Sequence, residues 1–177
     1  ERGKVIDAIK RVDPAMSALR PMLPGLTYTV PPQEAGKIDL SRAEAGALVA
    51  AVKAGADAPL SKALQKASQG ISPLTCREIA CRTAGDRDPL VSTLTAGEWQ
   101  RLTAAIDRTR CAVCTGENRT PYLVNRPDGS PLEFSFQPLI QYGLDARGQA
   151  MPSFSALLDT FYARRSADDR MRARSRD

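Results

Sequence analysis

Between Gln69 and Gly85 the sequence reads Gln-Gly-Ile-Ser-Pro-Leu-Thr-Cys-Arg-Glu-Ile-Ala-Cys-Arg-Thr-Ala-Gly, and Pro59-Leu-Ser-Lys-Ala-Leu-Gln-Lys-Ala-Ser68 precedes it. Two short helical patterns, 58–68 and 73–84, flank a glycine-bearing turn, and Ser72 with Pro73 opens the second. This pattern predicts a helix-hairpin-helix. Backbone N–H groups at a helix N-terminus suit phosphate oxygens, because they are unpaired and the helix dipole favours an anion. The alternative is a tight helical corner that binds nothing.

The composition indicates an ordinary folded protein. Its 177 residues suffice for one medium domain or two small ones, and 42% of them are hydrophobic. Aromatic residues make up only 5%, so the core must rest on Ala, Leu, Val and Ile. No apolar run approaches membrane-spanning length and no signal peptide is visible, so we expect no membrane and a cytoplasmic location. The chain begins with Glu1 and a strand-like run follows at once, which suggests a piece of a longer protein.

The net charge of +5 tolerates polyanionic partners without requiring them. Six arginines and three aspartates lie between Arg164 and Asp177, so that tail carries much of the excess. The overall charge is therefore weak support for nucleic-acid binding.

Four cysteines allow a zinc site or a set of idle thiols. Cys111 and Cys114 have zinc-knuckle spacing, and Cys76 and Cys81 are the thiols that would complete four ligands. Against this, five residues on a helix turn Cys76 and Cys81 about 140° apart. The chain has no histidine to replace either one. We therefore expect no cofactor or metal and favour buried or unused thiols.

The N-terminal third is predicted to be mostly irregular. Residues 4–12 are short and rich in β-branched side chains, so we expect a strand that Asp13-Pro14 ends. Prolines and glycines between 16 and 39 exclude long regular elements. Four apolar residues are expected to anchor this stretch to a surface: Leu23, Leu26, Tyr28 and Val30.

Helices and then a β-hairpin are predicted after residue 40. Ser41-Arg-Ala-Glu44 is a capping-box pattern that opens a helix to about Lys53, and Thr95-Ala-Gly-Glu98 opens another through about Thr109. Trp99, Leu102, Ala105 and Ile106 have helical spacing typical of a core face. Strands are expected at 121–125 and from 132 to 136 or as far as 142, around the turn Asp128-Gly129. A final helix starts at Ser155 and becomes almost wholly charged after Ser166.

The residue types argue against an enzyme. Without histidine the usual catalytic triads and general bases are missing. No phosphate-cradling glycine loop or dinucleotide fingerprint is present. Helix-hairpin-helix DNA glycosylases need a lysine or carboxylate placed beside the hairpin, and Lys62 and Lys66 look like ordinary helix-surface residues.

Several segments together resemble the NFACT family, also called fibronectin-binding protein A-like, which includes the bacterial RqcH proteins. The matching segments, in order, are Val5-Ile-Asp-Ala-Ile-Lys-Arg-Val12, 17–28, 31–33, Lys37, Gly70-Ile-Ser-Pro-Leu74, 77–79, 157–162 and 169–170. The resemblance implies an α+β fold with four parts: the later NFACT-N domain (1–40), a helical region (41–115) with the helix-hairpin-helix (58–85), a β-hairpin returning to the NFACT-N sheet (116–152) and the start of a coiled-coil arm (153–177).

The resemblance also implies a function and partners. It implies a fragment of a ribosome-quality-control factor that binds an obstructed 50S ribosomal subunit and recruits tRNA to extend the stalled chain without mRNA. The family's Asp-Arg tRNA-contacting motif would lie upstream of Glu1, so no residue here inherits that role. Ser72 stands where the common hairpin has its second glycine, which weakens close approach of the backbone to a phosphate.

The candidate RNA-binding residues fall into two groups. At the hairpin they are backbone groups and nearby basic side chains: Gly70, Ile71, Ser72, Lys62, Lys66 and Arg77. Lys10, Arg11 and Arg20 form the second group. For each side chain alone, a solvated surface role is the competing interpretation. Two alternatives remain for the whole chain: a surface adhesin that binds fibronectin, and a zinc-stabilised module.

Overall fold

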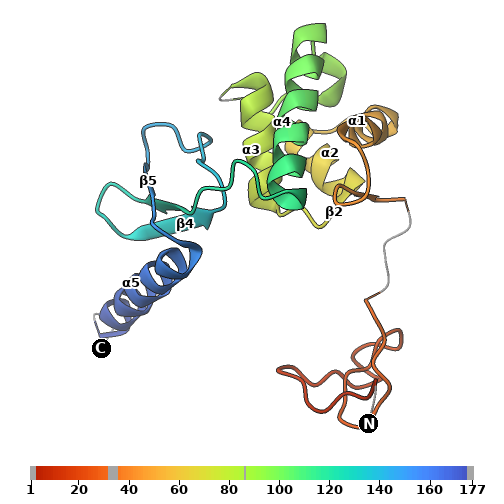
Figure 1. Ribbon diagram of the computed structural model, residues 1–177, viewed down its shortest axis with the longest axis vertical. Coiled ribbons are helices and arrows are strands. Elements are labelled where there is room, and N and C mark those ends of the chain that lie inside the picture. Colours follow the sequence, from red (N-terminus) through yellow and green to blue (C-terminus); the bar gives the residue numbers. More distant parts are fainter. Residues whose placement is uncertain (1–2, 32–35, 86, 175–177) are drawn as a thin grey trace. The chain divides into compact units, whose positions relative to one another are not determined.

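The structure is a computed structural model that describes residues 3–31, 36–85 and 87–174, with side chains as far as residue 167 (Figure 1). It divides into two compact units, Glu1–Ala35 and Gly36–Asp177. Helices and small sheets both occur, so the predicted α+β class is confirmed.

The first unit contains no regular strand among its described residues. Isolated antiparallel bridges join Lys4 to Thr27 and Val12 to Met22. The predicted strand over residues 4–12 is therefore wrong between these two points. Ile6 and Ile9 are 91% and 112% exposed, so the β-branched residues that favoured a strand have no neighbouring strand to pack on.

The apolar anchors expected in this unit are not buried within it. Leu26, Tyr28 and Val30 are exposed, and Leu23 is only partly buried. The predicted lack of long regular elements is confirmed for the described residues of 16–31.

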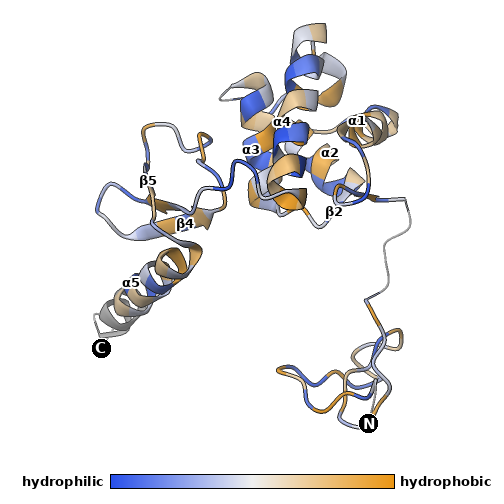
Figure 2. Ribbon diagram, viewed as in Figure 1, coloured by the Kyte–Doolittle hydropathy of each residue, from blue (hydrophilic) through white to orange (hydrophobic). Residues whose placement is uncertain are grey.

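Four helices form the main core of the second unit. They are α1 (Ala45–Ala54), α2 (Leu60–Ala67), α3 (Pro73–Ala84) and α4 (Ala96–Cys114), with a short 3-10 turn η1 (Val91–Thr93) between the last two. Aliphatic side chains fill the interior, as predicted; Leu48, Leu60, Leu64, Ile79, Leu102 and Ile106 are fully buried. Each helix shows both apolar and polar residues, as Figure 2 illustrates.

The hairpin helices agree closely with the prediction. Helix α3 has the predicted bounds, and α2 begins two residues later and ends one residue earlier than expected. The strand β1 (Ile38–Asp39), which precedes α1, lies parallel to β2 (Ser68–Gln69). Strand β2 forms the start of the hairpin turn. The turn therefore lies against the segment that leads into α1.

Only one of the two predicted capping boxes forms. At α4, Thr95 Oγ1 accepts the Glu98 N–H and Glu98 Oε2 accepts the Thr95 N–H at 2.9 Å. At α1 the N-cap residue is Glu44, without a side-chain cap. Ser41 instead donates its hydroxyl to Asp39 at 2.7 Å, because a bend separates it from the helix start.

A three-stranded antiparallel sheet follows, in the order β4-β3-β5. Its strands are β3 (Tyr122–Asn125), β4 (Pro131–Ser135) and β5 (Arg147–Ala150). The Asp128-Gly129 turn is confirmed: Gly129 has φ of 84°, and Asp128 Oδ1 accepts the Ser130 N–H. The predicted extension of the second strand to Tyr142 is wrong, since the chain leaves the sheet after β4 and contacts α3. Strand β5 was not predicted.

Helix α5 (Phe154–Arg174) packs on this sheet through a second small core. Leu123, Leu157 and Phe161 are buried there, and the Phe134 ring meets the Phe161 ring edge-on with centroids 4.8 Å apart. The final helix is thus confirmed, starting one residue earlier than predicted. That this helix begins a coiled-coil arm stays a prediction, as does the return of the hairpin to an NFACT-N sheet.

Candidate nucleic-acid interface

The hairpin turn uses part of its own donor capacity internally. Gly70 has φ of 80°, a conformation that favours glycine, and Ser72 is the N-cap of α3. Ser72 Oγ accepts the Thr75 N–H at 3.2 Å, and Pro73 in the first helical position has no N–H. The α3 N-terminus therefore offers a phosphate fewer donors than the motif alone predicts. Gly70 and Ser72 are exposed, and Ile71 is partly buried against the main core.

Other helix ends in this unit are occupied by its own carboxylates. Asp88 accepts the Ser61 N–H at 2.9 Å and the Ser61 hydroxyl at 2.6 Å, at the N-terminus of α2. Asp57 accepts the same two groups from Ser92 at η1. The backbone hydrogen bond from Ser92, followed by that of its hydroxyl, lowers the pKa of Asp57 below its ordinary value. These internal anions already satisfy the donors that an outside phosphate would use.

Three candidate cations lie on the helix-hairpin-helix. Lys62 and Lys66 are exposed on α2, four residues apart and therefore on one face. Arg77 is exposed on α3, where its Nε donates to Gln141 Oε1 at 3.2 Å. This single bond orients the guanidinium without neutralising it. The second unit therefore carries the whole hairpin group of candidates.

The other candidate group lies in the first unit. Lys10 and Arg11 are exposed, and Arg11 Nη2 lies 3.6 Å from Asp7 Oδ1. Arg20 donates its Nε to the Thr29 carbonyl at 2.8 Å and lies over the Tyr28 ring. Arg20 therefore has a structural role within its own unit, which the sequence did not indicate.

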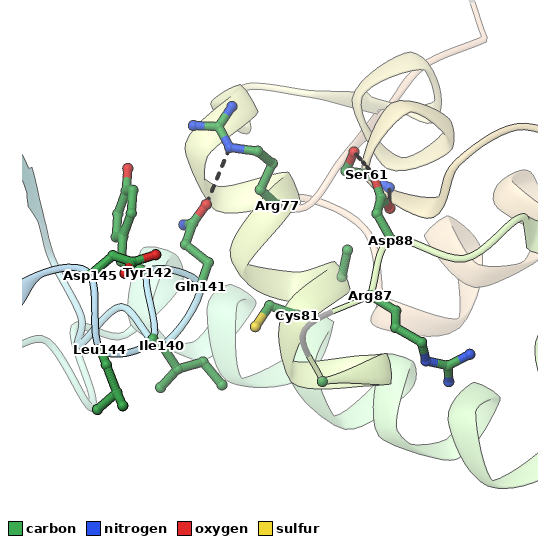
Figure 3. A pocket seen from close by; sticks show the side chains of 13 residues that line it. Ser61, Arg77, Cys81, Arg87, Asp88, Ile140, Gln141, Tyr142, Leu144 and Asp145 are labelled. Carbon is green, nitrogen blue, oxygen red and sulfur yellow. Dashed lines mark hydrogen bonds between the residues drawn. The ribbon is translucent and has the colours of Figure 1, made fainter.

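Arg77 also borders a cavity of about 570 Å³ (Figure 3). The cavity lies between α3, the loop at 85 and 87–88, and the segment 140–145. Arg87 borders it too, and pairs through Nη2 with Glu98 Oε1 at 2.8 Å. Cys81 and Tyr142 contribute further lining.

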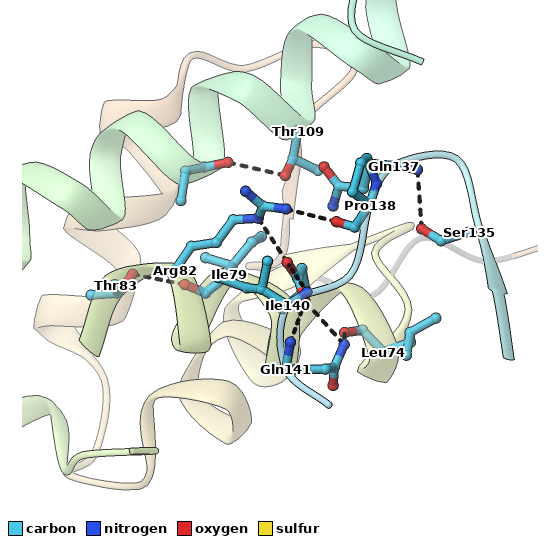
Figure 4. Close-up of polar contacts among 12 residues, drawn as sticks. Leu74, Ile79, Arg82, Thr83, Thr109, Ser135, Gln137, Pro138, Ile140 and Gln141 are labelled. Atoms are coloured by element: carbon cyan, nitrogen blue, oxygen red, sulfur yellow. Dashed lines mark hydrogen bonds and ion pairs between the residues drawn. The ribbon is translucent and has the colours of Figure 1, made fainter. Parts of the chain in front are cut away.

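A buried carboxylate holds one wall of this cavity in place, beside the contact between Arg82 and Pro138 that Figure 4 shows. Glu78 is fully buried on α3 and accepts the backbone N–H groups of Ile140 and Gln141. Arg82 Nε lies 2.8 Å from Glu78 Oε1, and Arg82 Nη2 donates to the Pro138 carbonyl at 2.7 Å. Sequence reasoning missed this contact. The only local signal was the spacing of Glu78 and Arg82, four residues apart on one helix.

The described residues contain no group of three or more His, Cys, Asp or Glu that could hold a metal ion. Cys76 is buried on α3, and burial raises the pKa of its thiol above the ordinary value. Since thiolates are the metal-binding form, this favours a neutral core thiol. Cys114 is exposed at the end of α4, with Sγ 3.7 Å from the Leu40 carbonyl oxygen.

A family model of the NFACT N-terminal and middle domains matches residues 1–177. The chain belongs to the NFACT family. The crystal structure of the fibrinogen binding protein from Staphylococcus aureus is similar to this NFACT chain, with 26% sequence identity and a TM-score of 0.63. That similarity covers 92% of this chain and 52% of the other, so the chain spans about half the length of that structure. A comparison with curated proteins gave no match.

Exposed lysine and arginine side chains stand beside a hairpin turn, in a unit that its own core and capping bonds stabilise. Across the residues described, no helix is both long and apolar enough to span a membrane.

Proposed function

We propose that this NFACT chain is a non-catalytic RNA-binding part of an RqcH-like ribosome-quality-control factor. In this proposal the cytoplasmic parent protein binds obstructed 50S subunits and recruits tRNA for template-free tailing of stalled chains. The observation that carries it is the presence of Lys62, Lys66 and Arg77 as exposed cations on one helix-hairpin-helix in an NFACT chain. Arginine and lysine supply the phosphate contacts on which RNA affinity depends.

A binding role fits the polar chemistry better than catalysis does. Three acidic groups of the second unit are engaged in capping and pairing: Asp88 with Ser61, Asp57 with Ser92, and Glu78 with Ile140. A general acid or base needs a proton-transfer partner in reach and a pKa near neutrality. The pKa of Asp57 is instead lowered by its hydrogen bonds, which stabilise the charged, capping form.

The test is binding of a tRNA transcript and of 50S subunits by the protein over a range of salt concentrations. The variant reverses three charges: Lys62→Glu, Lys66→Glu and Arg77→Glu. We expect weaker binding and a salt slope smaller by about 2, since each lost phosphate contact removes roughly 0.7–0.9 from the slope.

A matched control reverses three exposed arginines away from the hairpin: Arg147, Arg164 and Arg165. Both variants change the net charge equally. If the attraction to RNA is purely non-specific, binding should therefore weaken equally in both. Equal losses, or unchanged affinity and slope in the hairpin variant, would remove the hairpin cations from the interface.

A second candidate is a surface adhesin that binds matrix proteins, fibronectin in particular. The observation in its favour is the similar structure, which is named for fibrinogen binding. Binding of the protein to immobilised fibronectin and fibrinogen, compared with an equally basic control protein, tests it. Saturable binding that the control lacks would support the adhesin, and equal retention of the two proteins would reject it.

A further inference from the structure

A groove of about 320 Å³ lies between α3 and α4, away from the hairpin turn. Three arginines line it, together with small and apolar side chains: Arg82, Arg101, Ala104, Ala105, Arg108 and Ile140. None of these residues belongs to the candidate groups predicted from sequence. Ile140 also borders the larger cavity beside Arg77, so the two hollows share one wall.

Helix periodicity aligns two of the arginines along the groove. Arg101 and Arg108 are seven residues apart on α4, which is close to two full turns and about 10 Å along the axis. Ala104 and Ala105 lie between them in sequence and have side chains of a single methyl group. Small side chains therefore lie between two arginines on one side of α4.

Backbone carbonyls orient two of the guanidinium groups. Arg101 Nε donates to the Thr83 carbonyl at 2.8 Å, and Arg82 Nη2 donates to the Pro138 carbonyl at 2.7 Å. A carbonyl fixes a guanidinium without cancelling its charge, which leaves its other N–H groups able to pair with an anion. The side chain of Arg101 nevertheless remains 56% exposed.

The charges around the groove leave it positive. Glu78 pairs with Arg82, and Glu98 is shared between Arg87 at 2.8 Å and Arg101 at 4.0 Å. Arg108 has no hydrogen-bond or ion-pair partner among the residues that the structure describes. Of the three arginines that line the groove, Arg82 is therefore paired, Arg101 lies 4.0 Å from a shared carboxylate, and Arg108 is unpaired among the described residues.

We propose that this arginine groove is a phosphate-binding subsite for the RNA backbone, in which Arg101 and Arg108 contact two phosphates and Arg82 positions the wall. Guanidinium groups bind phosphate oxygens through paired N–H donors, and a groove lined in part by small residues admits the backbone of one strand. The inference rests on the proposed RNA-binding function and adds a second contact surface to it.

The experiment measures tRNA affinity against salt concentration for the protein and for two variants, Arg108→Gln and Arg101→Gln/Arg108→Gln. The single variant removes no hydrogen bond or ion pair made with a described residue, so it tests binding with little disturbance of the fold. The matched control is Arg164→Gln, which removes one exposed arginine of α5. Thermal unfolding of each variant confirms that it is folded before binding is compared.

We expect the salt slope to fall by roughly 0.7–0.9 in the single variant and by roughly 1.4–1.8 in the double variant, with an unchanged slope in Arg164→Gln. Folded groove variants that bind tRNA with the original affinity and slope would overturn the groove while leaving RNA binding intact. If the unsubstituted protein fails to bind tRNA at any salt concentration, the proposed function and the groove are overturned together. The two failures are thus distinguishable.

Discussion

The Glu78 carboxylate accepts the Ile140 backbone N–H through both of its oxygens, at 3.1 Å and 3.0 Å, across 62 residues of sequence. The carboxylate is fully buried, and Arg82 supplies the opposite charge at 2.8 Å. A buried charge is tolerated only when it is paired and hydrogen-bonded. This contact therefore attaches the segment between β4 and β5 to the helix-hairpin-helix.

Replacing this carboxylate should strongly destabilise the second unit. Glu78→Ala leaves the partly buried Arg82 unpaired and the two backbone N–H groups without their acceptor, so we expect a loss of about 3–5 kcal/mol in the free energy of unfolding. Urea unfolding measures it, with Glu117→Ala as the control, because Glu117 is exposed. A loss below about 0.5 kcal/mol, the range of ordinary surface changes, would contradict the assigned role.

The α4 capping box gives a second, smaller prediction. Thr95→Ala removes the acceptor of the Glu98 N–H, so we expect a loss of about 1 kcal/mol in unfolding free energy. Ser41→Ala is the paired variant, since sequence alone assigns it the same role but the structure does not. Ser41→Ala should cost clearly less. Equal costs measured by urea unfolding would mean that the α1 box also forms.

The lowered carboxyl pKa values predict how stability depends on pH. Hydrogen bonds from the Thr95 N–H, then from its hydroxyl, lower the pKa of Glu98, and those from Ser92 lower the pKa of Asp57. A group whose folded pKa is lowered stabilises the fold above its unfolded pKa, near 4, and loses that contribution as the pH falls through the folded pKa.

The free energy of unfolding should thus fall as the pH is lowered below about 5. Glu98→Gln and Asp57→Asn should each make this fall less steep. The measurement is urea unfolding at several pH values. Exposed Glu117→Gln serves as the control and should leave the slope unchanged. A Glu98→Gln profile parallel to that of the parent would contradict the assignment.

Close packing in the small sheet gives the fourth prediction. A Cβ added at Gly148 on β5 would overlap the ring of Tyr122 on β3. Gly148→Ala should therefore destabilise the β3–β5 pair by about 1–3 kcal/mol, measured by hydrogen exchange of the strand amides. Gly46→Ala is the contrast, because a Cβ there meets open space on α1 and should be neutral or slightly stabilising. Tyr122→Ala added to Gly148→Ala should recover part of the loss, and no recovery would argue against the overlap.

Local sequence signals predicted those elements that local interactions define. Ser72 and Pro73 set the start of α3, and Gly85 sets its end. Thr95 with Glu98 sets the start of α4. Asp128-Gly129 likewise set the hairpin turn. In each case the residues that decide the structure are within a few positions of one another.

The elements that failed depend on distant neighbours. Residues 4–12 have strand-like composition, but Ile6 and Ile9 pack on no strand in their unit. Strand β5 has polar, exposed residues with no strand pattern, and exists because β3 offers it a free edge. Helix or strand propensity cannot anticipate such pairing, since tertiary contacts override it.

The site shows the same division. Lys62, Lys66 and Arg77 could be proposed from the sequence because they flank a recognisable motif, and all three are exposed. The arginine groove was missed because Arg82 and Arg101 are on separate helices and meet only after α3 packs on α4. Glu78 was missed because its partners at residues 140 and 141 lie in an irregular segment.

We propose that this NFACT chain binds RNA through cations on its second unit. The most direct measurement is the affinity of the protein for a tRNA transcript as a function of salt concentration, beside its affinity for immobilised fibrinogen and fibronectin. We predict saturable tRNA binding whose salt slope falls when Lys62, Lys66 and Arg77 are reversed, and no more retention on the matrix proteins than an equally basic control shows. Saturable matrix-protein binding together with undetectable tRNA binding would contradict the account.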